Sequence, residues 1–112
     1  MEKEIRWVGS AYEDLLGFPV DVRRQAGFQL GKVQAGLEPD DWKPFDELGP
    51  GIREIRLRDA VGAFRVLYVA KFAEGIYVLH CFQKKTQATS QKDRRIAETR
   101  YRAIVVAKGA NP

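Results

Sequence analysis

Basic residues recur on three consecutive predicted strands of this chain, at spacings that suit binding chemistry. In chain order they are Arg56 and Arg58 in IREIRLRD, Arg65 in AFRVLYVA, and Lys84 and Lys85 after IYVLHCF. Neighbouring strands lie about 4.8 Å apart, so these cations can converge on one surface of a sheet. Arginine and lysine both suit phosphate groups. The pattern predicts an anion-binding surface, although charge on an outer strand face is also typical of a solvated surface.

Arg65 differs from the other cations because nearly all of its neighbours in the sequence are apolar. An arginine in a central strand is rarely buried without an anionic partner. Glu54 or Asp59 can supply that partner in a structural ion pair, and a substrate phosphate can supply it instead. The sequence leaves these alternatives open.

The segment HCFQKKTQATSQKDRR, residues 80–95, follows the last predicted strand. Its paired lysines and its run of hydroxyl and amide groups from Thr86 to Ser90 suit contacts with an anion. They also suit an ordinary solvated exit from the core, in which Ser90 caps the final helix. His80, the only histidine, is either a substrate contact or a hydrogen-bonded core residue.

Composition limits the class of protein. The 112 residues fit one domain spanning residues 1–112, and the net charge of +4 permits a polyanionic partner without requiring one. Cys81 is the only cysteine, which excludes an intramolecular disulfide. We find no glycine-rich phosphate loop, metal-spaced His/Cys cluster or nucleophile elbow. The absence of a signal-like or membrane-spanning run predicts a cytoplasmic protein without membrane contacts.

The hydrophobic patterns predict a small α+β domain in the order β-α-α-β-β-β-α, with helices packed on a largely antiparallel four-stranded sheet. Strands are expected at 4–9 and within IREIRLRD, AFRVLYVAKF and IYVLHCF. A short helix begins with a capping box at Ser10, and a longer one carries the apolar stripe Val22, Ala26, Leu30, Val33 and Leu37. Residues 38–51 are rich in proline and glycine and are expected to form a connecting loop.

Four segments together resemble the RelE/HigB superfamily of toxin–antitoxin toxins, and specifically its phage-derived, HigB-like branch. They are LGFPVDVR, ELGPGIREIRLRD, GAFRVLY and VLHCFQKKTQATSQKD, in the order and spacing of that family. The resemblance extends over about the whole domain and implies the RelE-like fold. It also implies a ribosome-dependent mRNA endonuclease that uses neither metal nor cofactor and inhibits translation.

The resemblance assigns roles to individual residues. The family's basic positions on the second and third strands correspond to Arg56, Arg58 and Arg65, and its basic residue after the last strand corresponds to Lys84 or Lys85. From these positions and from the residue types we expect catalytic roles for Arg65, Lys85 and Arg56, and substrate binding by Arg58, Lys84, His80 and Thr86. Glu54 stands where relatives carry another basic residue, and residues 86–91 lack the tyrosine that some relatives use in catalysis. These departures leave the general acid and base unassigned. They weaken phosphate binding little, because RNA cleavage by its own 2′-hydroxyl requires mainly in-line geometry and charge stabilisation.

The resemblance also implies two partners, which are mRNA on the ribosome and an antitoxin that neutralises the toxin. A helix-turn-helix protein from the adjacent gene is the expected antitoxin. Two alternative functions remain open. A gyrase-poisoning relative would cleave nothing and would not need the strand cations. A non-catalytic RNA-binding module would need exposed aromatic residues for base stacking.

Overall fold

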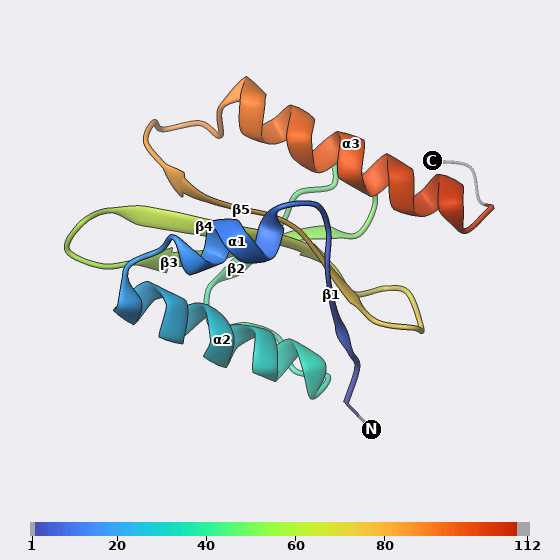
Figure 1. Cartoon of the computed structure of the whole chain (residues 1–112), viewed down its shortest axis with the longest axis horizontal. Helices are drawn as coiled ribbons and strands as arrows, with labels where there is room; N and C mark the ends of the chain where they lie inside the picture. The colour runs from blue at the N-terminus through green and yellow to red at the C-terminus, as the bar shows by residue number, and fades with distance from the viewer. Residues whose placement is uncertain (1, 110–112) are drawn as a thin grey trace.

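A five-stranded sheet organises the structure (Figure 1). The computed structural model describes residues 2–109. The elements in chain order are β1 (Ile5–Trp7), α1 (Ala11–Leu16), α2 (Val20–Gln34), β2 (Trp42–Pro44), β3 (Ile52–Arg58), β4 (Ala63–Val69), β5 (Ile76–Lys84) and α3 (Gln91–Ala107). The strands lie in the order β1-β5-β4-β3-β2, with β1 parallel to β5 and the other neighbouring pairs antiparallel. The α+β class and the expected elements are confirmed, with one strand more than the four expected.

The additional strand, β2, lies inside the segment 38–51 that we expected to be only a loop. Its three residues pair antiparallel with β3, which places Lys43 opposite Glu54. A strand this short contains no alternation of apolar and polar residues long enough to be recognised. β2 forms the edge of the sheet beside β3 and adds Lys43 to the face on which Glu54 lies.

Two details of the helices differ from the prediction. Ser10 precedes α1, but its hydroxyl donates to the Asp14 carboxylate and accepts no capping bond from a backbone N–H. α2 ends at Gln34, and Gly36 then turns the chain with φ of 84°. Leu37 therefore leaves the apolar stripe of α2 and is 59% exposed.

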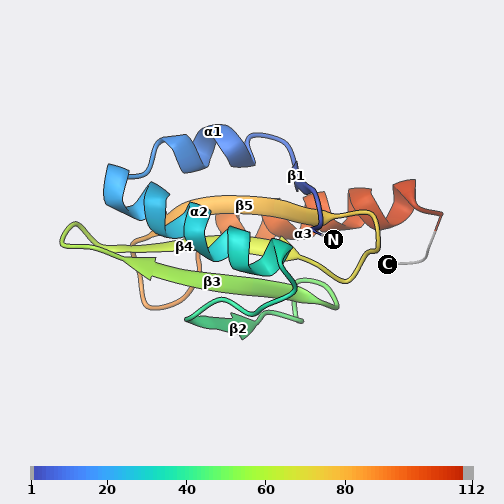
Figure 2. The same cartoon turned by 90° about the horizontal axis from the view of Figure 1, so that it is seen from below.

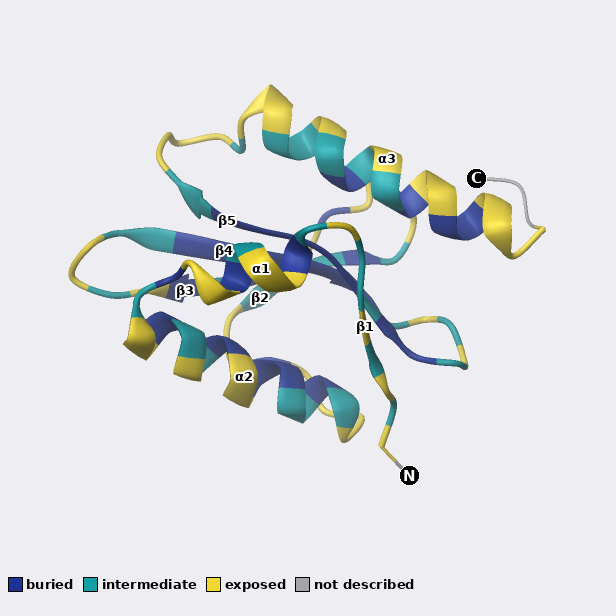
Figure 3. Cartoon of the chain, viewed as in Figure 1, coloured by how far each residue is buried: buried dark blue, intermediate teal, exposed yellow. Residues whose placement is uncertain are grey.

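Helices cover both faces of the sheet. α1 and α2 pack on one face and α3 on the other, so the sheet lies between two apolar cores (Figure 2). Most of β4 is buried between them (Figure 3). The ends of β3 and β5 that carry Arg58 and Lys84 are less covered, and these two residues are exposed and half-buried respectively. Within residues 2–109, none of the helices is long and apolar enough to cross a membrane.

Candidate active site

The register of β3, β4 and β5 brings predicted cations onto one face of the sheet. Arg56 lies directly opposite Arg65, and Ala63 lies between Arg58 and Lys84 in the adjacent row. Because opposed residues share a face and strands lie about 4.8 Å apart, the backbones of Arg58 and Lys84 are about 10 Å apart. This is the face on which α3 packs, at the end of the sheet that α3 leaves less covered. We call this surface the basic face; its cations are Lys43, Arg56, Arg58, Arg65 and Lys84.

A buried ion pair lies at the centre of the basic face. Arg65 Nε is 3.6 Å from Glu54 Oε1, and the two side chains are 7% and 1% exposed. Lys43 Nζ lies 4.0 Å from the same carboxylate oxygen. Asp59, the other candidate partner of Arg65, instead accepts hydrogen bonds from backbone N–H groups in the β3–β4 turn. Glu54 is therefore the acidic partner of Arg65, and it offsets the repulsion between opposed Arg56 and Arg65.

Arg65 and Glu54 keep hydrogen-bonding groups that their ion pair does not use. Arg65 Nη1 donates to the Phe64 carbonyl at 2.9 Å, while Arg65 Nε and Glu54 Oε1 are buried without a hydrogen-bond partner among residues 2–109. Burial lowers the pKa of Arg65, and the Glu54 carboxylate opposes that shift. The arginine stays charged at neutral pH because its pKa begins so high.

Lys84 lies within the electrostatic influence of the same centre. Burial lowers the pKa of Lys84, and the positive charge of Arg65 lowers it further. The charged form of Lys84 is thus less favourable here than in water. A phosphate placed beside Lys84 and Arg65 would reverse that cost, so the basic face is electrostatically suited to an anion.

Lys85 and Thr86 lie on the loop that follows β5 and not on the sheet itself. Both are exposed, and together with Lys84, Lys92 and Asp93 they line a hollow of about 270 Å³. The Thr86 hydroxyl donates to a backbone carbonyl within the loop. The loop therefore borders the basic face and can contribute a cation and a hydroxyl to a ligand bound there.

His80 is buried beneath the first turn of α3 rather than exposed on the basic face. Its Nε2 lies 2.7 Å from Asp93 Oδ1, and its ring stacks on Phe82 with centroids 5.0 Å apart. Asp93 also accepts a hydrogen bond from Ser90, which caps α3 as expected by accepting from the Asp93 backbone N–H. This placement suits a residue that positions the loop 85–90 better than one that touches substrate.

If the chain cleaves RNA as the resemblance to RelE/HigB toxins implies, His80→Leu should slow that cleavage by about 10- to 100-fold, because small displacements of positioned groups cost that much. His80→Gln should recover part of the loss, since its amide can still donate to Asp93. The comparison requires cleavage rates and melting temperatures of both variants. Wild-type cleavage by a folded His80→Leu protein would contradict the positioning role.

Two contributors to the site were not recognisable from the sequence. Lys43 lies on the short strand β2, for which the sequence contains no signal. The contact between His80 and Asp93 depends on a register shift between β4 and β5 at Leu67 and Tyr68. The acidic residue three positions after Ser90 was recognisable as part of a helix cap, but its pairing with His80 was not.

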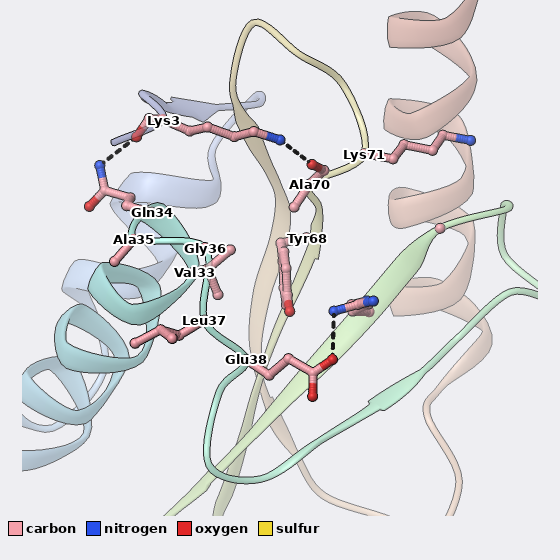
Figure 4. Close-up of a pocket in the computed structure, with 12 residues that line it drawn as sticks. Lys3, Val33, Gln34, Ala35, Gly36, Leu37, Glu38, Tyr68, Ala70 and Lys71 are labelled. Carbon is pink, nitrogen blue, oxygen red and sulfur yellow. Dashed lines mark hydrogen bonds and ion pairs between the residues drawn. The ribbon is translucent and has the colours of Figure 1, made fainter. Parts of the chain in front are cut away.

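A larger hollow, of about 470 Å³, lies on the opposite face of the sheet, between the end of α2 and strands β3 and β4 (Figure 4). Lys3 there donates to the Ala70 carbonyl (Figure 4), and Arg53 lies 3.8 Å from Glu38. The Tyr68 hydroxyl is buried there without a hydrogen-bond partner among the described residues. Lys71 also lines it, but its amine donates to the Tyr101 hydroxyl. Because each of its three cations is held by a nearby oxygen and none lies directly opposite another in the sheet, this hollow is a weaker candidate for phosphate chemistry than the basic face.

A comparison with protein families connects this geometry to a known group. The family model described as "Phage derived protein Gp49-like (DUF891)" matches residues 13–102, from α1 to most of α3. The chain belongs to the Gp49-like family. The match includes all the strands of the basic face and the loop 85–90, so the candidate site lies within the part that defines the family. No curated protein matches the chain closely enough to be called a relative.

The Gp49-like family is toxin-like and is related to the RelE/HigB-type toxins. Its members are commonly toxins of toxin–antitoxin systems. The family resemblance found from the four sequence segments is therefore confirmed at this level. The sheet with α1 and α2 on one face and α3 on the other is consistent with the RelE-like fold.

Proposed function

We propose that this Gp49-like protein is a HigB-type toxin that cleaves mRNA on the ribosome. The observation that supports this most directly is the basic face, where two rows of cations from β3, β4 and β5 surround the buried Arg65. Such a surface holds several phosphates of an RNA strand and concentrates positive charge at one of them. The proposal includes a cytoplasmic location, since its substrate is the translating ribosome.

The proposed reaction uses only RNA, protein side chains and solvent water. The 2′-hydroxyl gives its proton to water, a bond forms between O2′ and phosphorus, and the bond from phosphorus to O5′ breaks. O5′ then takes up a proton from water, which leaves a cyclic phosphate and a 5′-hydroxyl. Arg56, Arg58 and Lys84 orient the backbone, and Arg65 stabilises negative charge that develops on the phosphate oxygens. Lys85 and Thr86 hold the RNA from the adjoining loop.

The test is to induce the chain alone in a bacterial host and to follow amino-acid incorporation and mRNA integrity. We expect incorporation to stop and mRNA to be cut only where ribosomes are translating it. A variant with three basic-face residues neutralised, R56Q/R58Q/K84Q, should lose this effect. The matched control, R6Q/R24Q/R102Q, removes the same charge from exposed residues outside the basic face and should retain it.

Other outcomes would replace the proposal. Continued amino-acid incorporation with a DNA-damage response would favour a gyrase-poisoning toxin. A non-catalytic RNA-binding module would be favoured if the chain binds RNA without cleaving it and if both triple variants lose RNA binding equally. We further propose that the protein encoded by an adjoining gene, expected to contain a helix-turn-helix, is the antitoxin that restores growth.

A further inference from the structure

An apolar groove lies between α1 and α2, on the opposite side of the sheet from the basic face. The hollow measures about 440 Å³, and Trp7 of β1 lines its floor. Tyr12, Leu16 and Val20 border it and are 48%, 45% and 50% exposed. Three large apolar side chains exposed side by side are typical of a protein-binding surface rather than of scattered surface hydrophobics.

Arginines give the groove a charge preference. Arg23 and Arg24 line it, and Arg23 Nε is buried without a hydrogen-bond partner among residues 2–109. Arg24 lies 3.9 Å from Asp21, but both side chains are about four-fifths exposed, so that pair is weak. Arg23 is half-buried, so a partner that covered the groove with apolar groups alone would bury the rest of its guanidinium without a partner, which is unfavourable. The groove therefore suits a partner that carries carboxylates.

Two glycines of α2 favour a helical partner. Gly27 and Gly31 are four residues apart, and Gly27 lines the groove. A Cβ atom at either position would meet nothing within 4 Å, so the packing of this chain does not require glycine at either one. Glycine inside a helix is destabilising relative to alanine. Small residues at this spacing let a second helix approach closely, and such an approach would account for glycine at positions 27 and 31.

A strand-forming partner fits less well. β1 lies at the edge of the sheet but has only three residues, so it offers few backbone hydrogen bonds to an added strand. An amphipathic helix instead matches the length of α2, along which Val20, Arg24, Gly27 and Gly31 lie on one face at helical spacing.

We propose that the groove between α1 and α2 is the docking site for an acidic amphipathic helix of the antitoxin. Apolar side chains of that helix pack against Tyr12, Leu16 and Val20, a carboxylate pairs with Arg23, and the helix crosses α2 at its glycines. The inference rests on the proposed function for the identity of the partner. It predicts neutralisation by a protein that contacts the toxin away from its catalytic cations.

The decisive variant is G27L/G31L. It should fold with equal or higher melting temperature, because leucine favours a helix more than glycine does. Its affinity for the protein encoded by the adjoining reading frame should fall about tenfold or more, as for loss of a central interface contact. L16D should weaken the complex similarly. V106D, which alters an exposed apolar residue of α3 outside the groove, is the matched control and should bind normally.

The outcomes separate this inference from the proposed function. A G27L/G31L protein that stays toxic when the adjoining protein is co-expressed, while wild type is neutralised, supports the groove. Equal binding by G27L/G31L and wild type, or no complex with wild type, overturns it. A dimer of the isolated chain that G27L/G31L disrupts also overturns it, since a second copy would then occupy the groove. Complex formation through the groove by a chain that cleaves no RNA would reject only the proposed function.

Discussion

Arg65→Gln is expected to slow mRNA cleavage on ribosomes by about 10²–10³-fold, the typical cost of losing one preorganised donor to developing charge. Arg65 lies at the centre of the basic face, where it is 6% exposed and therefore poorly screened by water. It also lies directly opposite Arg56 in the sheet. The Arg65 side chain is already fixed in place, so it need not reorganise for its charge to act on a phosphate held between Arg56 and Lys84.

Loss of Arg65 also leaves Glu54 buried beside Lys43 alone, so the single variant should lose stability as well as activity. The double variant E54Q/R65Q separates the two effects because it removes both buried charges. If Arg65 acts on the phosphate, the double variant should regain stability over R65Q but remain slow. If Arg65 is only structural, the double variant should regain both.

Arg65→Lys should restore little cleavage. A lysine keeps the charge, but it cannot donate to the Phe64 carbonyl and present further N–H groups in a fixed plane at once. The measurements are melting curves and initial cleavage rates on stalled ribosomes for all three variants. A folded Arg65→Gln protein that cleaves at the wild-type rate would reject the catalytic role.

Residue type and alternation were sufficient to predict β1, β3, β4 and β5, but not β2, and to bring Arg56, Arg58 and Arg65 onto one surface of the sheet. From Glu54 to Arg58, charged and apolar residues of β3 alternate, and the short hairpin then pairs Arg56 with Arg65 on the same face of the sheet. The sequence also correctly limited the acidic partner of Arg65 to two residues. It could not choose Glu54 over Asp59, because that choice depends on the turn in which Asp59 accepts backbone hydrogen bonds.

The orientation of His80 shows where alternation fails. In a regular strand, His80 would share a face with Val78, which lies in the core beneath α1 and α2. The register shift at Leu67 and Tyr68 instead places His80 opposite Leu67, on the side of α3. One extra residue in a strand moves every later side chain to the opposite face of the sheet. In IYVLHCF no glycine or other turn residue marks the place where this shift occurs.

Glu54→Gln is expected to lower the free energy of unfolding by about 3–5 kcal/mol, the usual result of removing one partner from a buried ion pair. The substitution conserves side-chain volume, so the loss reports charge and not a cavity. Glu38→Gln is the matched control, because Glu38 pairs with Arg53 at 3.8 Å but its side chain is 62% exposed. That variant should lose no more than about 1 kcal/mol.

The same substitution should have the opposite effect on RNA association. Without the Glu54 carboxylate, the charges of Lys43, Arg65 and Lys84 are less neutralised, so phosphate should bind the surviving folded protein more tightly and with steeper salt dependence. Denaturant titrations and binding measurements at several salt concentrations test both effects. Equal stability losses in Glu54→Gln and Glu38→Gln would mean that Glu54 is not the buried counter-charge. In that case the basic face would have to be stabilised by solvent screening, and Arg65 would no longer be its preorganised centre.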